Sequence, residues 1–185
     1  ETGPVIETYF DISGESVKLV KNEKGFLTAK VEIIIVFKKG DEIITFNKKI
    51  IDSPEMTENE IVDFIDVDRF AIPAGKYQVE ISLSDHNDAE GETQTSLVDI
   101  VVPAPPSGVF ISDIQLVSAF KKATEPGKFS KSGYDILPMV NDRDLRPGMS
   151  EVVCYAEIYV ATTDVAGDMF LVRAYLSHAE TDEIV

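Results

Sequence analysis

The sequence predicts an all-β protein of two tandem antiparallel β-sandwiches, of which the second is incomplete. Three observations favour this class: apolar and polar residues alternate with a period of two, turn-forming residues separate the alternating runs, and a proline-rich segment divides the chain. Of the 185 residues, 44% are hydrophobic and 27% are charged, which is typical of a folded globular protein. No stretch carries a sustained helical period of 3.6 residues.

The clearest strand pattern lies in residues 27–37. Its apolar face is formed by Leu27, Ala29, Val31, Ile33, Ile35 and Phe37. Residues 77–83 alternate in the same way. Five further strands are expected at residues 5–12, 15–21, 42–51, 64–72 and 93–102. Seven short strands with brief connections describe an antiparallel immunoglobulin- or fibronectin-like sandwich over residues 1–103.

The connections between these strands carry turn residues, such as Ser13-Gly14 and Pro73-Ala74-Gly75. One connection is expected to contain a short helical turn at residues 57–65, because Thr57 and Glu60 fit a capping box there.

The second half begins after a segment rich in proline, which lacks the amide donor and disfavours helix at the preceding residue. Residues 104–108 are therefore expected to form an extended, fairly stiff linker. Strand patterns follow at residues 109–120, 134–140, 151–161 and 170–177, and a further one starts at residue 183. Because a usual sandwich has about seven strands, we expect the second domain, residues 109–185, to be truncated or to be completed by another chain. An open sheet edge of this kind also favours self-association.

The charge balance excludes one class of partner. With 17 basic and 33 acidic residues, the formal net charge is −16, and no surplus of cations is present to replace counterions on the phosphates of a nucleic acid. The longest apolar run, residues 33–37, is far short of the ~20 residues that cross a bilayer, so no membrane span is expected. The segment from Asp52 to Asp68 contains many acidic residues and no basic residue. This run is either a docking site for a cation or basic partner, or a solvated loop and strand edge.

The residue patterns of common catalytic and cofactor sites are absent. The single cysteine, Cys154, excludes an intrachain disulfide and lies in an apolar strand pattern where we expect it to be buried. His86 and His178 show no paired spacing for a metal site. Neither a glycine-rich phosphate loop nor a serine-hydrolase elbow occurs. We therefore expect a non-catalytic protein without a cofactor.

Acidic residues in the loop at residues 85–92 are the candidates for a cation site. Asp85, Asp88 and Glu90 offer oxygen ligands, but no register of this loop satisfies the ligand positions of an EF-hand. A polar hairpin loop explains the same residues, because Asn, Asp and Gly are favoured in turns.

Two tyrosines are the candidates for a carbohydrate site. Tyr155 and Tyr159 are expected on one face of the strand at residues 151–161. They form either an aromatic platform for a ligand or ordinary cross-strand packing.

Several segments resemble the β-rich region of the GWxTD-domain proteins. Ile111-Ser112-Asp113-Ile114, Phe129 to Pro138 and Val153-Cys154-Tyr155-Ala156-Glu157-Ile158-Tyr159 occur in the order found there. The first half, with Ile72-Pro73-Ala74-Gly75-Lys76-Tyr77, is similar to the preceding sandwich of the same proteins. The chain contains no Trp and therefore lacks the naming Gly-Trp-x-Thr-Asp motif, which places that part of the family outside residues 1–185. The resemblance implies a bacterial secreted or envelope protein and supplies no catalytic residues.

These observations predict a non-catalytic, extracytoplasmic structural or protein-interaction module that works by shape and edge-strand pairing. Its partner would be another protein or the rest of its own chain. The alternative is a carbohydrate- or calcium-assisted ligand-binding module that uses the two tyrosines or the acidic loop.

Overall fold

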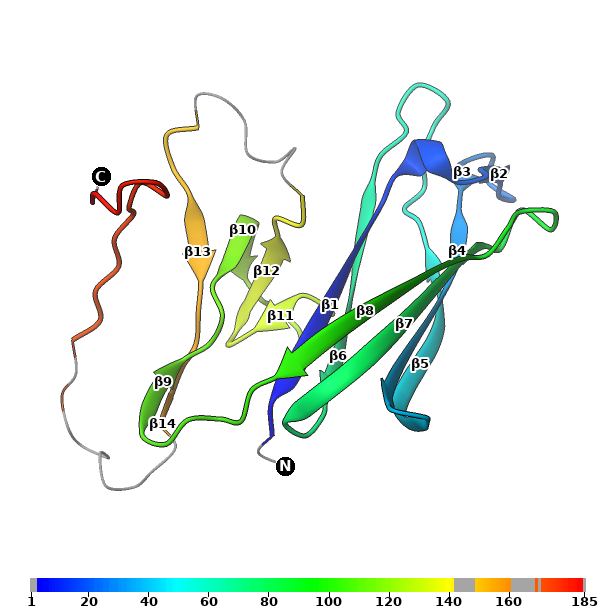
Figure 1. Cartoon of the computed structure of the whole chain (residues 1–185). Coiled ribbons are helices and arrows are strands. Elements are labelled where there is room, and N and C mark those ends of the chain that lie inside the picture. Colours follow the sequence, from blue (N-terminus) through cyan, green and yellow to red (C-terminus); the bar gives the residue numbers. More distant parts are fainter. Residues whose placement is uncertain (1–2, 142–148, 161–168, 170, 185) are drawn as a thin grey trace. The chain divides into compact units, whose positions relative to one another are not determined.

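The computed structural model describes residues 3–141, 149–160, 169 and 171–184. Within these residues it contains fourteen strands, all paired antiparallel, and one turn of 3-10 helix at Gly14–Ser16 (Figure 1). The predicted all-β class is therefore confirmed.

Contacts between residues divide the chain into two compact units. Unit 1 comprises Glu1–Pro105 and Ile114–Ala156, and unit 2 comprises Pro106–Asp113 and Glu157–Val185. The division into residues 1–103 and 109–185 that the sequence predicts remains a prediction.

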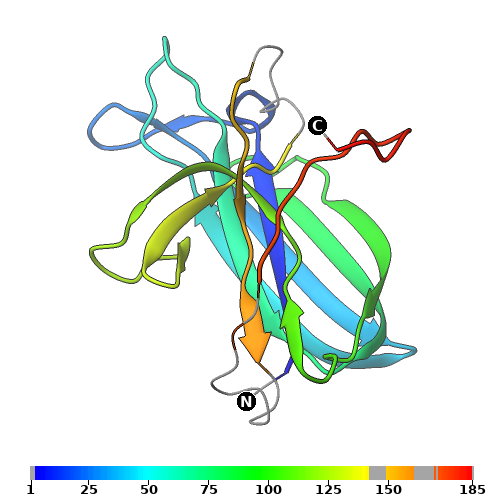
Figure 2. The same ribbon diagram turned by 90° about the vertical axis from the view of Figure 1, so that its left-hand side faces the viewer.

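Two facing sheets form a sandwich in the first part of unit 1 (Figure 2). The larger sheet has four strands in the order β5 (Glu42–Asp52), β4 (Lys30–Lys39), β7 (Gly75–Asp85) and β8 (Gln94–Val102). The smaller sheet pairs β1 (Val5–Ile12) with β6 (Phe64–Ala71). A separate ribbon pairs β2 (Val20–Lys21) with β3 (Leu27–Thr28).

Strand β4 supplies the centre of the core because its alternation places every second side chain between the sheets. Val31, Ile33, Ile35 and Phe37 are at most 5% exposed. Phe70 of the smaller sheet packs on Phe37, and their ring centroids lie 4.7 Å apart. Burial of each such side chain contributes about 1.5–3 kcal/mol, so this strand anchors the fold.

A second four-stranded sheet, hereafter the second sheet of unit 1, has the order β11 (Ser130–Lys131), β12 (Tyr134–Pro138), β10 (Gln115–Lys122) and β13 (Val153–Tyr155). A bulge interrupts the register of β10 and β12 between Val117 and Ala119.

Unit 2 contains one two-stranded sheet among its described residues, formed by β9 (Val109–Ile111) and β14 (Ile158–Val160). An isolated bridge joins Ser177 to Ile184. None of the described side chains of unit 2 is buried.

Two expectations for the first half were wrong. The strand expected at residues 15–21 is shortened to β2, because Ser16 donates its amide and its hydroxyl to the Ser13 carbonyl, at 3.0 and 2.8 Å, and closes a 3-10 turn. The helical turn expected at residues 57–65 does not form. Instead Thr57 bridges Glu60, and the backbone of Met56 pairs with Leu27 through two hydrogen bonds of 2.9 Å.

Three expected strands of the second half also differ. Residues 109–120 divide into β9 and β10, and residues 151–161 divide into β13 and β14, with residue 161 outside the described residues. At the division the Ser112 hydroxyl accepts the amide of Glu157 at 2.9 Å, so a side chain takes the place of a ladder partner. Residues 171–176 of the expected strand at 170–177 pair with no described strand.

Candidate functional site

The described part of the chain was compared with the ligand clusters of metal sites and with the helices of membrane spans. There, no group of three or more His, Cys, Asp or Glu side chains could hold a metal ion. The same part of the chain also has no helix with the length and apolarity that a bilayer span requires.

The predicted acidic loop is organised by a lysine. Asp85 accepts the backbone amide of Lys18 at 2.5 Å and that of Asn87 at 2.9 Å. Asp88 pairs with the Lys18 ammonium at 3.0 Å. Glu90 is exposed, and neither an ion pair nor a side-chain hydrogen bond joins it to a described residue. Two of the three acids, Asp85 and Asp88, thus contact Lys18. Asp88 pairs with its ammonium, and Asp85 stabilises the turn.

The two predicted tyrosines lie in different sheets. Tyr155 belongs to β13 in unit 1, where its hydroxyl lies 3.2 Å from that of Ser132. Tyr159 belongs to β14 in unit 2, where its ring stacks on Phe110 at 5.2 Å between centroids. The division of residues 151–161 into two strands therefore separates a pair that the alternation placed on one face.

Cys154 is exposed, contrary to the expectation of burial. It lies on β13, which pairs only with β10 among the described strands and is therefore an edge strand. An edge strand receives no cover from a neighbour on its second side.

The acidic run from Asp52 to Asp68 is largely neutralised by lysines of this chain. Glu55 pairs with Lys24 at 3.1 Å and Glu58 with Lys21 at 2.9 Å. Because these side chains are paired within the chain, the run presents less free negative charge than its composition indicates.

One part of this run is buried between the sheets of the sandwich. Lys49 on β5 points inward and pairs with Asp66 and, at 2.8 Å, with Asp68 on β6. Lys128 adds a second ammonium 2.8 Å from Asp66. Burial raises the pKa of Asp66, but hydrogen bonds from Lys128 and Lys49 outweigh it and leave that pKa below its usual value.

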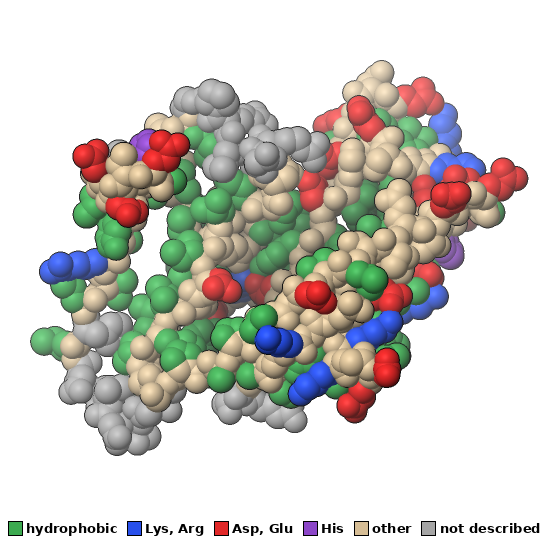
Figure 3. All heavy atoms as spheres, in the orientation of Figure 1, with side chains coloured by type: hydrophobic (Ala, Val, Ile, Leu, Met, Phe, Trp, Pro, Cys, Tyr) green, Lys and Arg blue, Asp and Glu red, His purple; other side chains and the backbone are tan. Residues whose placement is uncertain are grey.

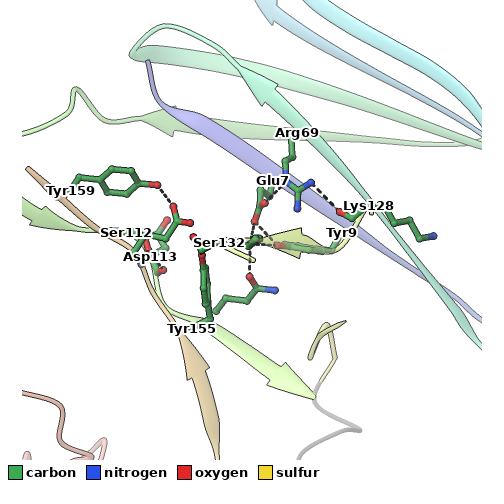
Figure 4. A network of polar contacts seen from close by, with 12 residues as sticks. Glu7, Tyr9, Arg69, Ser112, Asp113, Lys128, Ser132, Tyr155 and Tyr159 are labelled. Carbon is green, nitrogen blue, oxygen red and sulfur yellow. Dashed lines mark hydrogen bonds and ion pairs between the residues drawn. The ribbon is translucent and has the colours of Figure 1, made fainter. Parts of the chain in front are cut away.

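A second polar cluster lies on the other face of β1 and β6 (Figure 4). The Glu7 carboxylate pairs with Arg69 at 2.7 Å and also with Lys131, and it accepts the hydroxyl of Tyr9. Arg69 in turn donates to the Lys128 carbonyl at 3.0 Å. The cluster fixes the β11 region of the second sheet to the first sandwich within unit 1.

The electrostatics of this cluster favour a charged Glu7. Burial raises its pKa, but hydrogen bonds from Lys131, Tyr9 and Arg69 bring it below the usual value. Burial and the hydrogen bond to Glu7 raise the pKa of Tyr9, so its phenol stays neutral over the physiological range. A neutral phenol and an ionised, fully paired carboxylate are suited to structural cohesion rather than proton transfer.

The sequence singled out the run that contains Asp66 and Asp68 but gave no sign of their lysine partners, and it gave no prediction of the Glu7 cluster. The visible signal was the row of polar side chains at every second position of β1, namely Glu7, Tyr9 and Asp11. Lys131, the partner of Glu7 and Tyr9, lies more than a hundred residues away, and no spacing rule connects positions so distant.

An apolar hollow of about 330 Å³ opens on the second sheet of unit 1. It is lined by Val117, Phe120, Ser132, Tyr134, Ile136, Val153, Cys154 and Tyr155. Hydrophobic side chains gather over the region of β10, β12 and β13 in Figure 3. This aromatic hollow includes one of the two predicted tyrosines.

Comparison of the chain with protein-family models, with curated proteins and with solved structures found no match.

Proposed function

We propose that this chain is a non-catalytic structural or protein-interaction module, built of tandem immunoglobulin- or fibronectin-like sandwiches, in a secreted or envelope protein of bacteria. The observation that carries the interaction role is the apolar surface of unit 2. The resemblance to GWxTD-domain proteins supports the bacterial and extracytoplasmic parts of the proposal.

Unit 2 has no buried side chain among its described residues, although it is rich in apolar ones. More than 40% of the residue surface is exposed at Ile111, Ile158, Val160, Leu171, Val172, Tyr175 and Leu176. Leaving apolar surface in water costs about 25 cal/mol per Å². Monomeric proteins rarely present large apolar patches, and those that exist often mark interaction sites.

The segment at residues 171–176 has the side-chain pattern of a strand but no strand partner among the described residues. An extended segment of this kind is completed by pairing with a sheet edge, where backbone hydrogen bonds give affinity and alternate side chains give specificity. The partner edge belongs to another protein or to the rest of the same polypeptide.

Hydrogen exchange combined with sedimentation tests this role. In the isolated chain, we expect the amides of residues 171–176 to exchange at rates close to those of a free peptide. Raising the protein concentration from about 5 to 500 μM should produce association that protects these amides. A chain that stays monomeric with the same amides already protected contradicts the proposal.

A matched pair of variants locates the surface. Leu176→Lys should weaken association because it places a charge in the proposed contact, whereas Phe46→Lys, at an equally exposed position on β5 of unit 1, should not. Equal effects of the two substitutions would show that association is general aggregation.

A carbohydrate-binding module is the second candidate, and the aromatic hollow is the observation that favours it. Phe120, Tyr134 and Tyr155 offer the ring faces that sugars stack on. Saturable binding of an oligosaccharide in a calorimetric titration, lost in Tyr134→Ala, would support this role.

A further inference from the structure

We infer that the aromatic hollow on β10, β12 and β13 binds a small amphipathic carboxylate, with an aromatic or aliphatic body on the apolar floor and its anionic end beside Lys122. This site is independent of the interaction surface proposed for unit 2, because all of its residues belong to unit 1.

The floor of the hollow suits an apolar body. Val117 and Ile136 are buried beneath it, whereas Phe120 and Tyr134 are 60% and 47% exposed at its rim. A volume of about 330 Å³ lies at the lower end of the range for small-molecule sites. The apolar floor and the exposed rings together can remove the apolar body of such a ligand from water.

The polar side chains among the described lining residues are few, namely Ser132, Tyr134, Cys154 and Tyr155. The hydroxyls of Ser132 and Tyr155 are 3.2 Å apart, and the Lys131 ammonium lies 5.3 Å from the centre of the Tyr155 ring. Among the described residues, the lining contains no carboxylate or amide side chain. Sugars need several such groups to satisfy their hydroxyls, so this composition favours a mostly apolar ligand.

Lys122 supplies the charge complementarity. It lies directly opposite Tyr134 in the β10–β12 register, and it shares a face with Phe120 because the two are separated by two positions on one strand. Among the described residues Lys122 has no ion-pair partner, unlike Lys121, which pairs with Asp135 at 3.9 Å. In a chain of net charge −16, a lysine that has no ion-pair partner among the described residues and shares a strand face with the hollow favours an anion.

The probe for a test is 4-phenylbutyrate, and 4-phenylbutanol is its uncharged counterpart. In amide nitrogen–proton correlation spectra of the full chain, 4-phenylbutyrate should cause saturable shifts within residues 117–122, 132–136 and 153–155. The alcohol should bind about two- to fivefold more weakly, which is the range of one exposed ion pair. Raising the salt concentration should narrow this difference.

Two variants test separately what the charge of Lys122 and the apolar lining contribute to binding. Lys122→Gln should remove the preference for the acid over the alcohol and leave binding of the alcohol unchanged. Lys121→Gln is the matched control, since its side chain lies on the opposite face, and should keep the preference. Phe120→Ala should weaken both probes, whereas Phe46→Ala on β5 should weaken neither.

Three results would overturn the inference. The first is the absence of saturable shifts up to about 10 mM probe in a spectrum that shows a folded chain. The second is equal binding of acid and alcohol to the wild-type chain. The third is saturable binding of cellohexaose at the same amides in preference to 4-phenylbutyrate, which would assign the hollow to carbohydrate.

Discussion

Lys49 on β5 reaches between the two sheets of the sandwich and places its ammonium 2.8 Å from the carboxylate of Asp68 on β6. The same ammonium pairs with Asp66. An inward-pointing charge on an edge strand is one of the ways in which natural sheets avoid pairing with other chains. Lys49 therefore joins the sheets and also protects the long edge of β5.

Replacement of Lys49 should leave two carboxylates without their shared cation. We expect Lys49→Met to lower the free energy of unfolding by about 3 kcal/mol, because Asp68 loses its ion-pair partner, whereas Asp66 keeps Lys128. Lys48→Met is the control, since Lys48 points outward to Glu32 and is mostly exposed; its loss should stay below about 1 kcal/mol. Urea unfolding followed by circular dichroism measures both, and equal losses would contradict the assignment.

Acid should destabilise the fold through Glu7 and Asp66. The folded state lowers the pKa of both, so the unfolded chain takes up protons more readily as the pH falls. Their stabilisation is complete above the unfolded values, near 4.5 for Glu and 3.8 for Asp, and is lost as the pH falls through the folded values. Urea midpoints at pH 7, 5, 4 and 3 should therefore decline below about pH 4.5.

The contribution of Glu7 can be isolated with Glu7→Gln, which should lower stability at pH 7 and flatten the decline below pH 4.5. Glu60→Gln removes an exposed carboxylate that forms no ion pair with a described residue, and it should reproduce the wild-type curve. If the stability of Glu7→Gln declined with falling pH as steeply as that of the wild-type chain, the cluster would not hold an ionised Glu7.

Gly14 should not tolerate a side chain. A Cβ there would collide with the Val62 carbonyl oxygen and lie 2.8 Å from Cγ2 of Ile61. The backbone of Gly14 is also held by a 3.0 Å hydrogen bond to Asp63. We expect Gly14→Ala to cost about 1–3 kcal/mol through overpacking, whereas Gly127→Ala, whose nearest atom is 3.6 Å away, should change stability by less than about 0.5 kcal/mol. Thermal unfolding of the two variants would decide, and similar melting temperatures would refute the steric explanation.

Calcium should leave the melting temperature unchanged. Asp88 already pairs with the Lys18 ammonium, and Asp85 accepts two backbone amides. Melting curves in about 5 mM CaCl2, in EDTA and in NaCl of equal ionic strength should coincide, because a ligand raises stability only if it binds the folded state. A rise of several degrees that EDTA reverses would restore the acidic loop as a cation site.

The strands of the first half illustrate what alternation predicts well. Val31 to Phe37 bury one face as their pattern indicates, because a period of two and a core on one side dictate which side chains are covered. The pattern failed where a side chain took the place of a backbone partner, as at Ser112, and where a bridge to Leu27 overrode the capping box at Thr57. The candidate residues fared similarly: Tyr155 lines a hollow, but its expected companion Tyr159 lies in another sheet.

The sequence by itself determined the all-β class, the apolar core face of β4 and the absence of recognisable catalytic motifs, since these depend on local order along the chain. Only the tertiary structure decided that Lys49 and Lys131 are partners of distant carboxylates and that Lys122 lies opposite Tyr134, a residue that lines an apolar hollow. The physical reason is that charge pairing and cavity shape depend on which strands become neighbours, and that choice is made by the packing of whole sheets rather than by any short segment.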